Sequence, residues 1–71
     1  MNIVVINTVQ RMTYYVAIDA IACFKETEDG KLMVSLVNGE SLLTSQYRSA
    51  DQFFRTVRNI QRLDRLRKGE D

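Results

Sequence analysis

The sequence predicts a small α+β domain, in which an antiparallel sheet or a small curled barrel of about five strands is followed by one C-terminal amphipathic helix. Three observations support this fold class. The first 44 residues contain short runs of β-branched and aromatic residues. Asp-Gly at 29–30 and Asn-Gly at 38–39 separate such runs, as tight hairpins require. From about residue 50, apolar residues recur with helical spacing instead.

The length of the chain limits it to one modest core. A chain of 71 residues hides only about 60% of its unfolded surface when it folds. We therefore assign residues 1–68 to a single domain and 69–71 to a polar tail. The chain has one cysteine and no histidine, which excludes a disulfide framework and the common zinc sites.

Two strands are expected at the N-terminus. Residues 2–9 are rich in Val and Ile, and the polar pair at 10–11 separates them from a second strand at 12–18. A tight corner at Asp19 and Ala20 then leads onward. The apolar run 1–6 is too short to span a membrane and has no basic segment before it, so we expect neither a signal peptide nor membrane contact.

Three more strands follow at 21–27, 31–37 and 40–44. Asp29-Gly30 and Asn38-Gly39 lie between them, and we expect a two-residue type I′ turn at each because such turns need positive φ. The strands are thus expected to form an antiparallel meander from 12 to 44.

Apolar residues lie on both faces of these strands. Leu32 and Val34 alternate with Met33, and Ile3 alternates with Val4. Because one helix covers only one face of a sheet, either the sheet curls into a barrel or a second subunit covers the other face. We therefore expect a homodimer or another homo-oligomer.

Three side chains in these strands have expected roles. Cys23 lies between apolar neighbours and is expected to be a buried small side chain rather than a reactive thiol. A reducing, cytoplasmic setting is the default for a chain with this cysteine usage. Tyr14 and Tyr15 are expected to be half-buried packing residues, one of which could anchor an interface.

A helix is expected from 50 to 68, with Gly69 as its stop. Ser49 and Gln52 fit a capping box, in which the serine hydroxyl accepts from the Gln52 amide and the Gln52 side chain returns to Ser49. Asp51 is favourably placed in the first turn, near the positive end of the helix dipole.

The core stripe of this helix is expected to contain Phe53, Val57 and Ile60, which fall within about 60° of one another on a helical wheel. Asp64 falls in the middle of the same stripe. Because burial of a carboxylate is costly, we expect the helix to leave the core after about residue 61.

The hairpin pattern resembles that of the small flagellar FlbD-like family over residues 2–60, and more loosely that of LytTR-type DNA-binding domains. The resemblance is carried by residues before the first Asp-Gly turn and in the next hairpin, namely Ile21, Phe24, Glu26, Val34, Leu36, Asn38 and Gly39. The basic turns from Arg58 to Lys68 depart from the pattern expected of the flagellar family.

Nothing in the chain predicts an enzyme, a cofactor or a small-molecule substrate. There is no histidine to serve as a base, and the three glycines are scattered and form no phosphate-binding loop. Glu26, Glu28 and Asp29 cluster at a hairpin tip, where carboxylates are ordinarily solvated and where the ligand spacing of a calcium loop is missing. We therefore expect no metal site and no catalysis.

The candidate site is a stripe of arginines on the helix. Residues 1–54 carry four basic and six acidic groups, whereas 55–68 carry six basic groups and one acidic group. Four of these basic groups lie within about 80° on a helical wheel, namely Arg55, Arg58, Arg62 and Arg65. Asp51 can pair with Arg55, but the later arginines have no such partner on their stripe. No aromatic residue is expected to be interleaved with them, so the stripe would favour backbone phosphates of a nucleic acid over base edges.

Three interpretations of the stripe stay open: a solvated face whose stems shield apolar neighbours, a surface for nucleic acid, and a surface for an acidic protein. The leading functional prediction is a noncatalytic protein-binding or assembly module that contacts its partner through the C-terminal helix or a sheet edge. The alternative is a small nucleic-acid-binding protein that uses the basic helix face.

Overall fold

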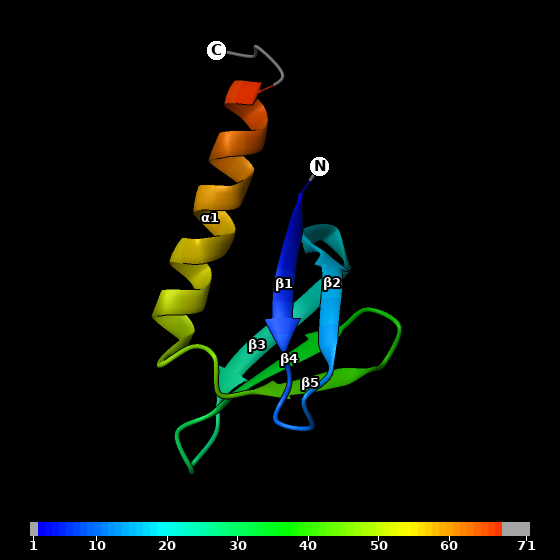
Figure 1. Ribbon diagram of the computed structural model, residues 1–71, viewed down its shortest axis with the longest axis vertical. Helices are drawn as coiled ribbons and strands as arrows, with labels where there is room; N and C mark the ends of the chain where they lie inside the picture. Colours follow the sequence, from blue (N-terminus) through cyan, green and yellow to red (C-terminus); the bar gives the residue numbers. More distant parts are fainter. Residues whose placement is uncertain (1, 68–71) are drawn as a thin grey trace.

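The computed structural model describes residues 2–67, which form five strands, a short 3₁₀ turn and one α-helix. Strands β1 (Ile3–Asn7) and β2 (Thr13–Ala17) form a two-stranded antiparallel sheet. Strands β3 (Ile21–Glu26), β4 (Leu32–Leu36) and β5 (Ser41–Thr44) form a second, three-stranded antiparallel sheet. The helix α1 (Ala50–Arg67) stands beside β1 and extends past the three-stranded sheet (Figure 1).

The predicted α+β class is confirmed, and the strands do not close into a barrel. The expected antiparallel meander from 12 to 44 is wrong for its first strand. Within residues 2–67, β2 pairs with β1 and not with β3. The 3₁₀ turn η1 (Ile18–Ala20) occupies the expected corner and carries the chain from the first sheet to the second. Its Ile18 is buried and belongs to the core to which both sheets contribute.

The expected strand ends were one or two residues too long. The first strand stops at Asn7 instead of residue 9, because a loop begins at Thr8. The predicted helix end at 68 and its stop at Gly69 lie outside the described residues, as does the polar tail.

All three hairpins are closed by three-residue loops. In the β3–β4 loop, the Thr27 amide donates to the Lys31 carbonyl at 2.8 Å and the Gly30 amide donates to the Thr27 carbonyl at 3.1 Å. The β4–β5 loop repeats this pattern and ends in Gly39, and the β1–β2 loop repeats it and ends in Arg11. This is a type I turn followed by a left-handed residue, so the two-residue type I′ turns that we expected at 29–30 and 38–39 are wrong.

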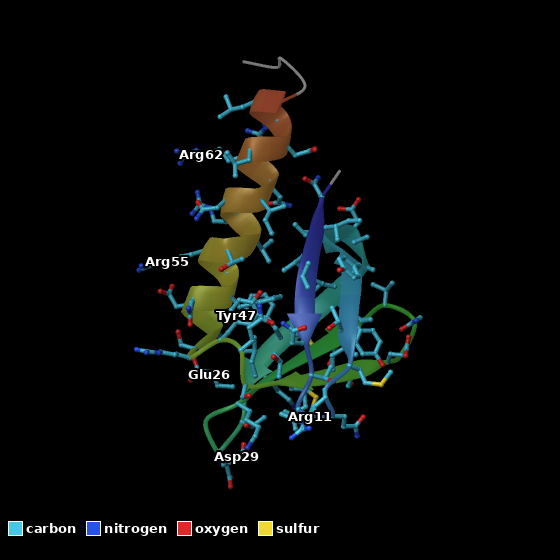
Figure 2. The ribbon with its side chains drawn as sticks, in the orientation of Figure 1. Arg11, Glu26, Asp29, Tyr47, Arg55 and Arg62 are labelled. Atoms are coloured by element: carbon cyan, nitrogen blue, oxygen red, sulfur yellow. The ribbon has the colours of Figure 1, made fainter. Side chains whose placement is uncertain are left out.

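The last loop residue has positive φ in each case: 66° at Arg11, 83° at Gly30 and 94° at Gly39. Glycine adopts this conformation without steric cost, whereas a residue with a Cβ does not. Arg11 at the tip of the first hairpin (Figure 2) is therefore strained where the two glycines are not.

The core fills the space between the two sheets and α1. Val4, Ile6 and Val16 of the first sheet and Leu32 and Val34 of the second are all buried. The first sheet joins the second at a corner, where the Thr44 hydroxyl donates to the Asn7 carbonyl at 2.6 Å. The Val9 amide also donates to the Leu43 carbonyl there, at 2.9 Å.

Phe53 of α1 is completely buried, as the helical stripe predicted. Its ring makes edge contacts with the rings of Phe24 and Tyr47, with centroids 4.9 Å apart in both pairs. Val57 and Ile60 are half-buried and pack against the same core. The Phe53 side chain thus packs the helix against β3 and against the segment before the helix.

Cys23 is exposed, so the prediction of a buried cysteine is wrong. The register of β3 against β4 shifts between Ile21 and Cys23, which is the mark of a β-bulge. The bulge turns Ile21 and Phe24 toward the core and Cys23 away from it. Of the two tyrosines, Tyr14 packs against the core as expected, whereas Tyr15 is 74% exposed and does not.

We predict that Arg11→Gly stabilises the protein by about 0.5–1 kcal/mol, because the left-handed conformation costs a Cβ-bearing residue more than glycine loses in entropy. Urea titration of both proteins measures the difference. Gly39→Ala is the matched reverse change and should be destabilising by about 1–2 kcal/mol. An added Cβ at Gly39 has no atom within 4 Å, so its cost reports the backbone alone. A destabilised Arg11→Gly protein would contradict the assignment of strain.

We also predict that Phe53→Ala costs about 3–5 kcal/mol of unfolding free energy, because the substitution opens a cavity at a fully buried ring. Phe54→Ala is the control, since its side chain is next in sequence but 47% exposed, and it should cost less than about 1 kcal/mol. Denaturant titration distinguishes the two. A loss below about 1 kcal/mol for Phe53→Ala would show that the helix is docked by other residues.

Candidate basic face of the helix

The start of α1 is fixed by side chains from three segments. The Ser49 hydroxyl accepts from the Gln52 amide at 3.1 Å, as the capping box predicted. The Gln52 side chain accepts from the Arg48 amide at 2.6 Å rather than from Ser49. The first helical amide, that of Ala50, donates to Glu26 Oε2 at 2.9 Å. Glu26 comes from the end of β3, so it ties the helix start to the sheet (Figure 2).

Tyr47 holds the segment before the helix against β1. Its side chain is buried, and its hydroxyl donates to the Val5 carbonyl at 3.4 Å. Burial raises the pKa of Tyr47, so the hydroxyl stays protonated and remains a donor. Together with the Glu26 contact, this hydrogen bond sets the position from which α1 departs.

All four predicted site residues are exposed and lie on the outer side of α1, away from the sheets. We call Arg55, Arg58, Arg62 and Arg65 the arginine face. Arg55 and Arg62 point away from the strands in Figure 2. The set spans eleven residues, which at about 1.5 Å per residue is about 15 Å from the first to the last.

Two members of the arginine face have contacts on the helix itself. Arg55 Nε lies 3.0 Å from Asp51 Oδ2, which is the ion pair that the spacing predicted. The guanidinium of Arg58 lies over the ring of Phe54, 5.7 Å from its centroid. The expectation that no aromatic side chain accompanies the stripe is therefore wrong, because Phe54 precedes Arg58 by one turn.

The arginine face has an apolar border on each side. Phe54 is 47% exposed, Leu63 58% and Leu66 61%. On a helical wheel Phe54 adjoins one edge of the arginine face, and Leu66, with Leu63 beyond it, adjoins the other. We call these three residues the apolar borders.

A hollow of about 350 Å³ opens among the side chains of this face. Its lining is entirely of hydrogen-bond donors or amides: Arg55, Arg58, Asn59, Gln61, Arg62 and Arg65. No carboxylate lines it, so its electrostatic preference is for an anion. The hollow offers neither a nucleophile nor a general base.

Asp64 is only 8% exposed, so the expectation that α1 leaves the core before this residue is wrong. The helical wheel placed Asp64 correctly on the stripe of Phe53 and Ile60, and its side chain is buried on that side of the helix. The buried carboxyl marks the inner side of α1 and leaves the outer side to the arginines.

Two acidic side chains of the hairpin tip, Asp29 and Glu26, have partners within the described residues. Hydrogen bonds from Lys31 and Thr27 lower the pKa of Asp29 to about 2, and Lys31 Nζ lies 2.9 Å from Asp29 Oδ2. The Glu26 carboxylate accepts a hydrogen bond from the Ala50 amide at the start of α1. In residues 2–67, no group of three or more cysteine or acidic side chains is arranged to hold a metal ion.

Comparison of the chain with protein-family models, with curated proteins and with solved structures finds no match. The resemblance to the FlbD-like family and to LytTR-type domains therefore stays a prediction. Within the described part of the chain, no helix is long and apolar enough to cross a membrane.

We predict that Glu26→Gln destabilises the protein by about 0.3–1 kcal/mol, because it removes a negative charge from the positive end of α1. The loss should shrink in high salt, which screens this charge. Glu28→Gln is the control, since it makes the same change at an exposed position on the same hairpin. Equal stabilities for the two variants in thermal unfolding would contradict a role for Glu26 in anchoring the helix.

Proposed function

We propose that this protein is a noncatalytic binding module whose arginine face and apolar borders dock an acidic, amphipathic segment of another protein. The observation that carries the proposal is the combination of four exposed arginines in one stripe with exposed Phe54, Leu63 and Leu66 beside them. Charge alone would attract any polyanion, so the apolar borders decide between the candidate partners.

An acidic amphipathic helix matches this surface in chemistry and in length. Carboxylates three or four residues apart on one helix are spaced like the arginines on α1. Apolar side chains beside those carboxylates would cover the apolar borders and remove them from water. The arginine face covers about 15 Å, which is nearly three turns of a partner helix.

Nucleic acid is the weaker candidate. A phosphate backbone would neutralise the arginines but would leave Leu63 and Leu66 without an apolar partner. Phe54 could stack on a base, but the guanidinium of Arg58 already lies over its ring. The remaining interpretation, in which the arginine stems only shield apolar neighbours, is tested by stability rather than by binding.

Among residues 2–67, Arg62 and Arg65 form no salt bridge, so they are the arginines most available to a partner. Arg58 lies between them and the Asp51–Arg55 pair. Replacement of Arg58 and Arg62 therefore removes charge from the centre of the face without disturbing that ion pair.

We predict that Arg58→Gln with Arg62→Gln weakens binding of a synthetic Glu/Leu amphipathic helical peptide by about tenfold and flattens its salt dependence. The unfolding free energy should hardly change, because glutamine has a helix propensity close to that of arginine. Fluorescence anisotropy at several salt concentrations, together with thermal unfolding, measures both effects. Lys25→Gln with Arg48→Gln is the control, since it removes two exposed charges elsewhere and should leave binding nearly unchanged.

A second pair of substitutions separates the candidate partners. Leu63→Ala with Leu66→Ala should weaken peptide binding but leave any binding of a DNA duplex unchanged. Duplex binding that depends on the arginines, without peptide binding, would replace our proposal with the nucleic-acid alternative. The arginine variant could instead bind both probes as before and lose stability clearly. That result would show that the arginine side chains only shield apolar neighbours.

A further inference from the structure

Strand β2 has an unpaired outer edge. Hydrogen bonds from Thr8 to Met12 and from Ile18 to Asn2 extend the β1–β2 ladder at its two ends. Because hydrogen-bonded pairs alternate in an antiparallel ladder, the odd-numbered residues of β2 point their backbone groups away from β1. Within residues 2–67, no other strand pairs with Thr13, Tyr15 or Ala17.

Part of the free edge of β1, in contrast, is covered by side chains. The Asn7 amide donates to Gln46 Oε1 at 2.9 Å, and its carbonyl accepts from the Thr44 hydroxyl. The Val5 carbonyl accepts from the Tyr47 hydroxyl. Three backbone groups of β1 that face away from β2 are therefore used inside the molecule, namely the amide and carbonyl of Asn7 and the carbonyl of Val5.

The outer edge of β3 is protected in a different way. A bulge lies between Ile21 and Cys23, and the exposed Lys25 and Glu26 place charges along the strand. Bulges and charges are the usual features that keep an edge strand from pairing with another chain. Strand β2 has neither, since Thr13–Ala17 contains no charged residue, no glycine and no proline. Its sequence, TYYVA, is rich in residues that favour strands.

We propose that β2 pairs with β2 of a second copy of this chain, antiparallel and about a two-fold axis at Tyr15. Tyr15 would then face Tyr15 of the partner, and Thr13 would face Ala17. The backbone groups of these residues would form about six hydrogen bonds, two for each hydrogen-bonded pair. The two hairpins would become one four-stranded sheet.

The second copy is the favoured occupant because the strand is neutral and complementary to itself. Two copies of an uncharged strand can pair without bringing like charges together. Pairing about a two-fold axis gives a dimer and leaves no free copy of the same edge for a third chain. Tyr15 is 74% exposed in the single chain, and the pairing would cover it with another tyrosine ring.

The position of α1 also permits this dimer. Strand β1 lies between α1 and β2 (Figure 1), so pairing through β2 would place the two helices at opposite ends of the sheet. The two arginine faces would then stay apart, and neither would be covered. A dimer through α1 would instead bring like charges together.

The test uses the whole chain and measures its assembly by sedimentation equilibrium over a range of concentrations. We expect a dimer, and we expect Tyr15→Lys to raise its dissociation constant by at least about tenfold, because the substitution places two like charges on the two-fold axis. Val37→Lys is the control, since it adds the same charge at a position that is 68% exposed and outside β2. It should leave the dissociation constant unchanged.

Amide hydrogen exchange tests the same pairing without a substitution. The amides of Thr13, Tyr15 and Ala17 should exchange slowly at concentrations where the dimer forms and rapidly on dilution. A monomer at every concentration would overturn the proposal, as would a dimer in which these amides exchange rapidly. Arg58→Gln with Arg62→Gln should leave the dimer intact, so failure of this proposal is distinguishable from failure of the proposed binding function.

Discussion

The ring of Phe53 lies against Phe24 of β3 and Tyr47 of the segment before α1, and the placement of the helix depends on these contacts. Because Phe53 sits in the first turn of α1, burial of its ring fixes which side of the helix faces the sheets. The arginines lie on the opposite side of the helix as a result. Basic residues on an undocked helix would have no fixed orientation relative to the sheets, so the hydrophobic contact determines the electrostatic surface.

The fold and the candidate site were predictable from the sequence to different degrees. The spacing of the arginines and of Phe53 identified the two sides of the helix, because helical periodicity is a local property. The Asp-Gly and Asn-Gly dipeptides located two turns but not their length, since glycine comes last in both kinds of hairpin loop. In the β1–β2 loop the left-handed position is occupied by Arg11, and an arginine gives no sequence signal for such a turn.

The errors arose where tertiary contacts override local pattern. Cys23 should share a face with Ile21 in a regular strand, and only the bulge in the β3–β4 register separates them. Asp64 was placed on the right stripe, but the inference that its burial would force the helix off the core was wrong. Phe54 as a neighbour of Arg58 could have been found from the i,i+4 spacing. The division of the strands into two sheets depends on contacts between distant segments and left no local signal.

The corner where Asn7 meets Thr44 and Gln46 also bears on how the chain folds. Every strand pair in the described chain joins neighbours in sequence, so each hairpin can form alone within about 1–10 μs. The two hydrogen bonds at this corner join residues that are 37 and 39 positions apart in the sequence. The chain between these residues loses conformational entropy when the loop closes, and the contacts at the corner offset that loss only after closure. We therefore expect that the rate of folding is limited by the step in which the first and last hairpins meet at this corner. Formation of any single hairpin is expected to be faster.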